Sequence, residues 1–290
     1  MDQKNEQKKV GIIGTGWVGG SYMQDFINRG IEPICYSLDP QYIGNKEKIK
    51  ECDYVLIAVP SPTKPDGFDD SIVRDAVKLV GKGKTAIIKS TVIPGTTNSI
   101  QEENPEIYVL HAPEFLSEAT ALDDVAHPKR NIIGIPKDND DFRKRAEEFL
   151  AISASAPFNI ICSATEAEFI KYARNCVGYI RIIFYNLMYD LAMKKGADWE
   201  KIKEAIAADP DNGPTYTQPV HKGGRGAAGN CFIKDYAAFT QYFKKEMKED
   251  LLGASILETI EKKNLELLLE SKKDFNLLKG VYGEGILKKG

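Results

Sequence analysis

The sequence predicts an α/β fold, in which a doubly wound, Rossmann-type parallel sheet is followed by an all-helical domain. Three observations support this fold class. Short apolar strands alternate with helix-compatible segments up to Ser163. A glycine-rich turn with the spacing Gly-x-Gly-x-x-Gly follows the first strand, and after Ser163 the pattern changes to long helical periodicity. Because strands that alternate with helices favour a parallel sheet, we expect two domains, at residues 1–163 and 164–290.

The first strand and its glycines have the pattern of a dinucleotide-binding turn. The apolar strand is Val10–Ile13, and a helix is predicted to run from the turn toward Asn28. In such a turn the first glycine allows the tight bend, the second lets the backbone approach a pyrophosphate, and the third allows close helix packing. The free N–H groups at the start of the helix would bind the pyrophosphate. The turn reads Gly14-Thr15-Gly16-Trp17-Val18-Gly19.

The end of the second predicted strand, at residues 31–36, bears on the choice between NAD and NADP. An acidic residue is expected there to bind the ribose hydroxyls of NAD. Ser37 stands at that position instead, and Asp39 follows two residues later. Because no arginine follows that could bind a 2′-phosphate, we expect NAD to be preferred over NADP.

Five further apolar runs continue the alternation, at residues 54–59, 85–89, 107–111, 131–135 and 158–162, with helices predicted over 72–80 and 140–150. Ligands of open parallel sheets bind beyond the carboxyl ends of the strands. The segments directly after the strands are therefore candidates for the functional site. They are Pro60-Ser61-Pro62-Thr63, the run from Ser90 to Thr97, and the run from Ala112 to Glu118.

The second half of the sequence is predicted to be helical. A capping pair, either Ser163 with Glu166 or Thr165 with Glu168, introduces a helix over 165–195. Its apolar stripe is broader than a small helical domain can cover, which predicts a homodimer. Further helices are expected from the cap Asp198 to 208, from about 235, and over 255–272, and residues 280–285 are expected to form a frayed tail.

Two polar groups in this half stand out as candidates for chemistry. Lys171 and Asn175 are one helical turn apart, away from the apolar stripe. A glycine-rich loop that begins at Gly223 leads to Cys231 and, four residues later, to Asp235. Glycines before a reactive side chain allow positive φ and close approach of a ligand. The alternative is an ordinary loop that precedes a buried cysteine.

Composition excludes several other functions. The net charge of −3 provides no basic surface for nucleic acid. No apolar run approaches the roughly 20 residues of a membrane span, and residues 1–9 form a polar tail without a signal sequence. The five cysteines contain no Cys-x-x-Cys pair, and the three histidines have no metal-ligand spacing. We expect a cytoplasmic protein without a metal.

Taken in order, five motifs make the chain resemble the nucleotide-sugar dehydrogenases, the UDP-glucose 6-dehydrogenase family. The resemblance runs from Val10 to about Leu269. It implies oxidation of the C6 hydroxyl of a nucleotide sugar, UDP-glucose to UDP-glucuronate, by two hydride transfers to NAD without release of the aldehyde. The motifs are the glycine turn; Val59-Pro60-Ser61-Pro62-Thr63; Lys89-Ser90-Thr91-Val92 with Pro94-Gly95-Thr96; Pro113-Glu114-Phe115-Leu116-Ser117-Glu118 with Pro128 and Arg130; and Lys171-x-x-x-Asn175 with Gly229-Asn230-Cys231-Phe232-x-Lys234-Asp235.

The resemblance also implies the roles of individual residues. Cys231 would add to the aldehyde, and Lys171 and Asn175 would stabilise the oxyanion. Oxidation of that adduct would give a thioester, and Asp235 and Glu114 would activate the water that cleaves it. Thr91 and Glu118 are further candidates for this role. Either Lys171 or a water held by Asp235 would take the first alcohol proton. Cofactor contacts are expected from Gly14, Gly16, Trp17, Val18, Gly19, Ser37, Asp39, Pro60, Thr63, Ser90, Thr91 and Glu118. Substrate contacts are expected from Glu114, Phe115, Leu116, Ser117, Lys171, Asn175, Tyr216, Arg225 and Gly229.

Two departures from the family pattern bear on the substrate. The loop reads Gly226-Ala227-Ala228-Gly229-Asn230-Cys231, where the family more often has Gly-Phe-Gly-Gly-Ser-Cys. The family's third domain, which binds the nucleotide, has no counterpart in the sequence. Either the nucleotide is held by fewer groups, among them Tyr216, Lys222 and Arg225 of this or a partner chain, or the substrate is smaller.

Two other functions stay open at this point. The 3-hydroxyacid and 6-phosphogluconate dehydrogenases also place a lysine and an asparagine one turn apart, but they oxidise once and do not need Cys231 or the Glu114 segment. A non-catalytic NAD-binding partner of another enzyme would have no use for Lys171, Asn175, Cys231 and Asp235 together. The number of NADH molecules formed per nucleotide sugar distinguishes these functions.

Overall fold

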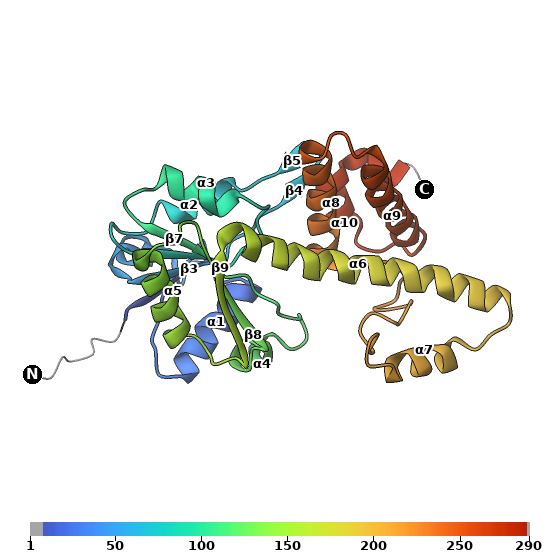
Figure 1. Ribbon diagram of the computed structural model, residues 1–290, viewed down its shortest axis with the longest axis horizontal. Helices are drawn as coiled ribbons and strands as arrows, with labels where there is room; N and C mark the ends of the chain where they lie inside the picture. Colours follow the sequence, from blue (N-terminus) through green and yellow to red (C-terminus); the bar gives the residue numbers. More distant parts are fainter. Residues whose placement is uncertain (1–7, 289–290) are drawn as a thin grey trace, which may run out of the picture. The chain divides into compact units, whose positions relative to one another are not determined.

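The computed structural model describes residues 8–288, which form two compact units (Figure 1). The first unit runs to Ser61 and then from Asp69 to Lys171, and the second comprises Pro62–Phe68 and the chain from Tyr172 onward. The first seven residues of the predicted polar tail lie outside the described residues. No helix within the described range is long and apolar enough to span a membrane.

The first unit is built on a seven-stranded sheet with the order β2-β1-β3-β6-β7-β8-β9. Neighbouring strands are parallel, except that β7 and β8 are antiparallel. The predicted α/β fold with its mostly parallel sheet is therefore confirmed, and the antiparallel junction is a feature that periodicity does not predict. The strands are β1 (Val10–Ile13), β2 (Ile34–Tyr36), β3 (Tyr54–Ile57), β6 (Thr85–Ile88), β7 (Tyr108–His111), β8 (Arg130–Ile135) and β9 (Phe158–Ser163).

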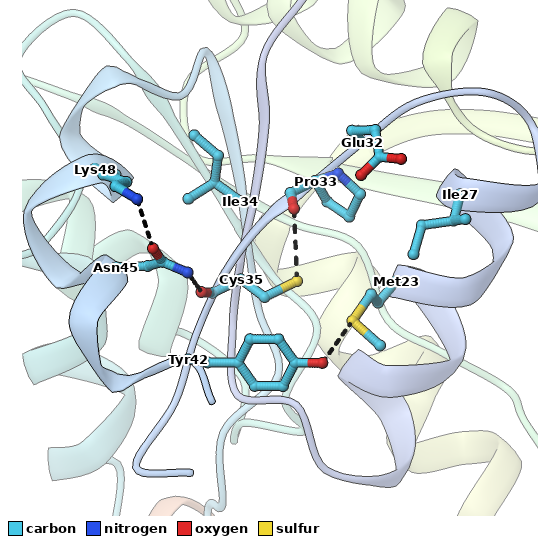
Figure 2. Close-up of a pocket in the computed structure, with 9 residues that line it drawn as sticks. All are labelled: Met23, Ile27, Glu32, Pro33, Ile34, Cys35, Tyr42, Asn45 and Lys48. Atoms are coloured by element: carbon cyan, nitrogen blue, oxygen red, sulfur yellow. Dashed lines mark hydrogen bonds between the residues drawn. The ribbon is translucent and has the colours of Figure 1, made fainter. Parts of the chain in front are cut away.

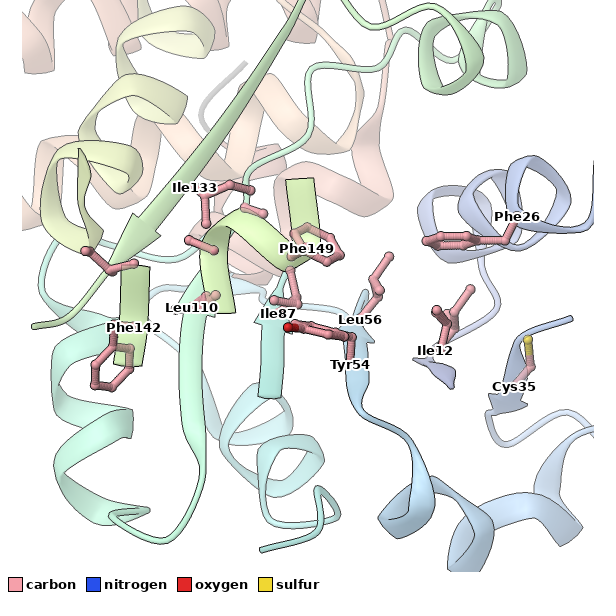
Figure 3. Close-up of a cluster of buried hydrophobic side chains, with 14 residues drawn as sticks. Ile12, Phe26, Cys35, Tyr54, Leu56, Ile87, Leu110, Ile133, Phe142 and Phe149 are labelled. Atoms are coloured by element: carbon pink, nitrogen blue, oxygen red, sulfur yellow. The ribbon is translucent and has the colours of Figure 1, made fainter. Parts of the chain in front are cut away.

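Helices pack on this sheet because its strands carry apolar side chains on both faces. On one face, Phe26 of α1 and Phe149 of α5 pack against residues such as Ile12, Leu56 and Ile87 (Figure 3). Helices α2 and α3 contact β3 and β7. The helical elements are α1 (Trp17–Asn28), η1 (Ile43–Glu51), α2 (Ser71–Val77), α3 (Thr96–Glu103), α4 (Ala121–Ala126) and α5 (Asp140–Ile152).

The start of α6 (Ala164–Lys194) is fixed by two carboxylates. Glu166 and Ser163 form a reciprocal capping box, in which each side chain bonds the backbone N–H of the other. The buried Glu168 accepts hydrogen bonds from the backbone N–H groups of Gly95 and Thr97 and from the Thr97 hydroxyl, at 2.6–2.8 Å. Burial nevertheless raises the pKa of Glu168 to about 7. Glu168 thus ties α6 to the segment after β6, where the candidate residues Ser90 and Thr91 lie.

The second unit is helical and includes one hairpin from the N-terminal half of the sequence. Its core joins α8, α9 and α10, with Ile233, Leu268 and Leu278 among the buried residues. The hairpin contacts α8 and α10. The elements are the rest of α6, α7 (Trp199–Ala208), α8 (Gly229–Glu246), α9 (Leu251–Glu270), α10 (Phe275–Tyr282), η2 (Glu284–Lys288), β4 (Thr63–Lys64) and β5 (Gly67–Phe68).

Two sequence-based expectations for the second unit are wrong. Helix α8 begins at Gly229 and not near Asp235, so Cys231 lies in a helix and not in a loop. Residues 280–285 are not a frayed tail: α10 extends to Tyr282, η2 follows, and Val281 and Ile286 are buried in the core. Burial of these apolar side chains outweighs the helix-breaking effect of the glycines, which made the segment resemble a tail.

Candidate active site

The glycine turn has the close packing that a dinucleotide site requires. Gly14 adopts φ +89°, and a Cβ there would lie 2.4 Å from the Ala58 carbonyl oxygen; a Cβ at Gly19 would lie 1.8 Å from the carbonyl oxygen of Gly14. By contrast, a Cβ at Gly16, the N-cap of α1, would have no heavy atom of the described residues within 4 Å apart from Gly16 itself and its two chain neighbours. No described side chain caps this helix start, and its first turn has no acidic residue. The turn therefore fits the pyrophosphate of NAD.

The residues expected to contact the cofactor ribose, Ser37 and Asp39, follow the end of β2. The Thr15 hydroxyl donates to the Ser37 hydroxyl at 2.8 Å, which links the glycine turn to the end of β2. Asp39 is exposed, and its carboxylate accepts from the backbone N–H of Gln41. Trp17 is 40% exposed at the start of α1, beside the half-buried Val18.

The segments after β3 and β6 are bonded to one another. The Ser90 hydroxyl contacts both backbone groups of Val59, and the Ser61 hydroxyl donates to the carbonyl of Thr91 at 2.7 Å. Thr91 is buried, whereas Pro60 is exposed. The hydroxyls of Ser61 and Ser90 thus hold the backbone together at the edge of the sheet where ligands of such folds bind.

Thr63 differs from the other residues expected to contact the cofactor, because its hydroxyl already has a partner in the second unit. The side chain is buried, and its hydroxyl donates to the carbonyl of Lys234 at 2.8 Å. We expect Thr63→Val to leave the NAD affinity unchanged in calorimetry and to lower the free energy of unfolding by about 1 kcal/mol. Thr63→Ser, which keeps the hydroxyl, is the control. A loss of NAD affinity of about tenfold in the valine variant alone would make Thr63 a cofactor ligand.

Lys171 is buried in the first unit and bonded to Glu114. Its ammonium group donates to the carbonyl of Glu114 at 2.7 Å and to the carboxylate at 2.8 Å. The other carboxylate oxygen accepts from the N–H of Leu116. An ammonium group has three donors, so two bonds to Glu114 leave one for a ligand. The Arg130 guanidinium lies 3.9 Å from the centroid of the Phe115 ring, and the Lys171 ammonium lies 5.6 Å from the same centroid.

Two buried groups at the carboxyl ends of β6 and β7, Lys89 and His111, have no role predicted from the sequence, although Lys89 belongs to one of the five motifs. Lys89 lies 4.4 Å from the ring centroid of Tyr22, and burial lowers its pKa to about 7. His111 is fully buried, neither ring nitrogen has a hydrogen-bond partner among the described residues, and burial lowers its pKa to about 3. Both groups influence the electrostatics near Glu114 and Lys171. In the sequence, only the position of Lys89 and His111 at the ends of apolar runs indicates that these side chains are buried near the site.

The second unit contains the predicted thiol, amide and carboxylate. Cys231 is exposed in the first turn of α8, where the helix dipole favours a thiolate. Asp235 follows one turn later and is 1% exposed. One of its carboxylate oxygens accepts from the Asn175 amide at 2.7 Å, and the other pairs with the Lys234 ammonium at 2.5 Å. Lys234, which belongs to the same sequence motif, is thus the counter-ion of Asp235.

The remaining predicted substrate residues have different surroundings. The Tyr216 hydroxyl accepts from Arg174, and its ring packs edge-on against Phe232. The guanidinium of Arg225 bonds Asn186 and pairs with Asp190, both on α6, so it is already occupied within this chain. Gly229 is the first residue of α8, with φ +83°. Ser117 and Glu118 are exposed and Leu116 is half-buried.

A separate pocket lies in the first unit, between α1 and η1 beside the edge strand β2 (Figure 2). In this pocket the Tyr42 hydroxyl donates to the sulfur of Met23 at 3.6 Å, and the Cys35 thiol points toward the Pro33 carbonyl. Burial raises the pKa of Cys35 to about 11, which leaves the thiol protonated and unreactive at neutral pH. The pocket contains none of the predicted site residues. Within residues 8–288, no group of three or more His, Cys, Asp or Glu could hold a metal ion.

A dinucleotide-binding unit with a buried Lys–Glu pair, followed by a helical unit with Cys, Asn and Asp, is the combination expected of the class of NAD-dependent dehydrogenases. Two family models match the chain: the UDP-glucose/GDP-mannose dehydrogenase family NAD binding domain at residues 43–151 and the central domain at residues 165–266. The chain belongs to this family. Its NAD binding domain implies NAD as the cofactor.

Individual relatives and solved structures agree with this assignment. UDP-glucose 6-dehydrogenase of Rickettsia bellii is 30% identical over 76% of this chain and 51% of its own length. A UDP-glucose dehydrogenase structure from the archaeon Pyrobaculum islandicum has a TM-score of 0.75 at 25% identity, covering 93% of this chain and 72% of that one. A Mycobacterium tuberculosis 3-hydroxyisobutyrate dehydrogenase has a TM-score of 0.68 over 98% of this chain and 99% of that one; at 16% identity this shows a shared fold alone.

The chain spans about half the length of most of the curated relatives that it matches. The part in common comprises the NAD binding and central domains.

Proposed function

We propose that the protein oxidises the C6 hydroxyl of a nucleotide sugar to a carboxylate in two successive NAD-dependent steps, with UDP-glucose as the expected substrate. The observation that carries the proposal is the set of groups around the start of α8. Cys231 lies in its first turn, and the buried Asp235 one turn later bonds Asn175. Asn175 in turn follows Lys171 by one turn of α6. A single oxidation of an alcohol has no use for the thiol.

NAD supplies the hydride acceptor in both oxidations, and the glycine turn with Ser37 and Asp39 would hold it. The first oxidation removes a hydride and a proton from the alcohol and leaves an aldehyde. The thiolate of Cys231 then adds to the aldehyde carbon and forms a thiohemiacetal. The third N–H of Lys171 and the Asn175 amide would stabilise the oxyanion.

Removal of a second hydride converts the thiohemiacetal to a thioester, and water cleaves it to a carboxylate and the free thiol. Asp235 and Glu114 are proposed to activate this water. The two carboxylate oxygens of Asp235 each have a partner, yet each oxygen has two lone pairs and can accept one more hydrogen bond from water. The Lys234 ammonium is the counter-ion of this buried carboxylate, and a carboxylate within hydrogen-bond reach of the water is the group that general-base action requires.

The number of NADH molecules formed per nucleotide sugar tests the proposal. Two NADH per UDP-glucose, together with UDP-glucuronate as the product, is the expected result. One NADH per substrate, with an aldehyde or ketone as the end product, would favour the 3-hydroxyacid type of dehydrogenase. No NADH from any nucleotide sugar, with NAD still bound, would favour the non-catalytic partner.

We also propose that the protein forms a homodimer across α6. Apolar side chains on this helix are 36–56% exposed, which is unusual for one face of a single helix. A second copy would cover them by a symmetric, self-complementary contact. They include Val177, Ile180, Phe184, Leu187, Met188 and Leu191.

Sedimentation at micromolar concentration is expected to detect a dimer. Phe184→Glu should shift it to a monomer, because a charge in an apolar interface loses its hydration. Leu122→Glu, on an equally exposed apolar residue of α4 in the first unit, is the matched control and should leave the dimer intact. A wild-type monomer would contradict the proposal.

A further inference from the structure

The glycine-rich loop before Cys231 is held in place by side chains from the end of α9 and from the turn that follows it. Glycine-rich backbone is conformationally free, so it does not position a nucleophile by itself. In the structure, backbone groups of residues 221–229 bond side chains of residues 264–274, which lie at the end of α9 and in the turn to α10. We call residues 264–274 the loop clamp.

Asn264 makes the central contact of the loop clamp. Its side-chain oxygen accepts from the N–H of Ala227 at 2.6 Å, and its amide nitrogen donates to the carbonyl of the same residue at 2.9 Å. Both residues are buried, at 1% and 0% exposure. Gly226 has φ +89°, and a Cβ there would lie 2.9 Å from the side-chain oxygen of Asn264. The glycine thus lets the loop approach Asn264 closely enough for both bonds.

Three further side chains extend the loop clamp on either side of Ala227. The Ser271 hydroxyl accepts from the N–H of Arg225 at 2.9 Å, and the Lys273 ammonium donates to the carbonyl of His221 at 2.7 Å. The carboxylate of Asp274 accepts from the N–H of Gly229 at 2.6 Å. Gly229 is the first residue of α8, two residues before Cys231. The contact of Asp274 therefore fixes the start of the helix that presents the thiol.

We infer that Asn264 and Asp274 are positioning residues for Cys231, which hold the loop and the first turn of α8 in the geometry needed for attack on the aldehyde. The inference rests on the proposed function. Attack by a thiolate depends steeply on its placement, because a misplacement of about 1 Å can cost about 100-fold in rate. The first oxidation does not use the thiol, so loss of the clamp should slow the two oxidations unequally.

The test measures both oxidations separately in Asn264→Ala, by single turnover with UDP-glucose and with its 6-aldehyde. The second oxidation is expected to slow by about 10- to 100-fold relative to the first. Amide hydrogen exchange at Ala227 and Gly229 should become faster. Asp274→Ala is the second variant, in case Asn264→Ala does not fold, and should lower the same ratio of rates.

Val281→Ala is the matched control, because Val281 is buried in the same core on α10 and its side chain cannot form a hydrogen bond to the loop. It should lower the melting temperature without changing the ratio of the two rates. The inference would be overturned if Asn264→Ala slowed both oxidations equally, or if the ratio of the two rates stayed unchanged although amide hydrogen exchange became faster. Either outcome would leave the proposed function standing. A parent enzyme that releases the aldehyde as its end product would overturn the proposed function and the inference with it.

Discussion

Cys231→Ser is expected to stop the reaction after the first oxidation, so that one NADH forms per UDP-glucose in place of two. Serine is a weaker nucleophile than a thiolate, and only the second oxidation needs a covalent adduct. Cys231 is exposed at the start of α8, where the helix dipole favours the thiolate. A serine at the same position does not become a comparable nucleophile. Stopped-flow measurement of NADH, with detection of the aldehyde or of a slowly hydrolysed ester by mass spectrometry, checks this result.

Cys162→Ser provides the matched control for the thiol. Cys162 lies in β9, is half-buried, and has a pKa that burial raises to about 11, so it has no reactive thiolate at neutral pH. This variant should still form two NADH per sugar. If Cys231→Ser also forms two NADH at the parent rate, the proposed double oxidation through Cys231 is wrong. A dehydrogenase that oxidises once, with Lys171 and Asn175 as its catalytic residues, then becomes the better explanation.

Lys171→Ala is expected to slow both oxidations, by about 10²–10³-fold, because an alkoxide or oxyanion develops in each step and one preorganised donor is lost. The variant should also be less stable. Glu114 is 6% exposed, and among residues 8–288 its carboxylate would keep only the N–H of Leu116 as a partner. Breaking a buried ion pair in this way costs about 3–5 kcal/mol. Single-turnover rates and urea unfolding measure the two effects separately.

The control for Lys171→Ala is Lys84→Ala, which removes a lysine that pairs with Asp53 at 2.7 Å in the same unit but is about one-third exposed. Its loss should leave both rates unchanged and cost less stability, since exposed pairs contribute about 0–1 kcal/mol. If Lys171→Ala slows only the second oxidation, Lys171 does not act on the first alkoxide. A water held by Asp235 would then remain as the candidate base for that proton.

The sequence alone determined the elements whose signal is local. The strands that begin at Val10, Tyr54 and Thr85 follow from short apolar runs, and the helix cap at Ser163 with Glu166 follows from residues three apart. The glycine turn is equally local, because three glycines within six residues suffice to predict it. Cys231, Asp235, Lys171 and Asn175 could be chosen in advance because their spacing matches a family motif.

Only the tertiary structure decided which partners these residues have. The start of α8 at Gly229 depends on Asp274, which is 45 residues away, and the loop before it depends on Asn264, 37 residues from Ala227. The hydroxyl of Thr63 reaches Lys234 across 171 residues of sequence. Such contacts leave no periodic signal, because a single buried hydrogen bond specifies one side chain and not a pattern. The burial of Lys89 and His111 is equally a property of the packed sheet, since desolvation of a charged group exists only after the surrounding elements have come together.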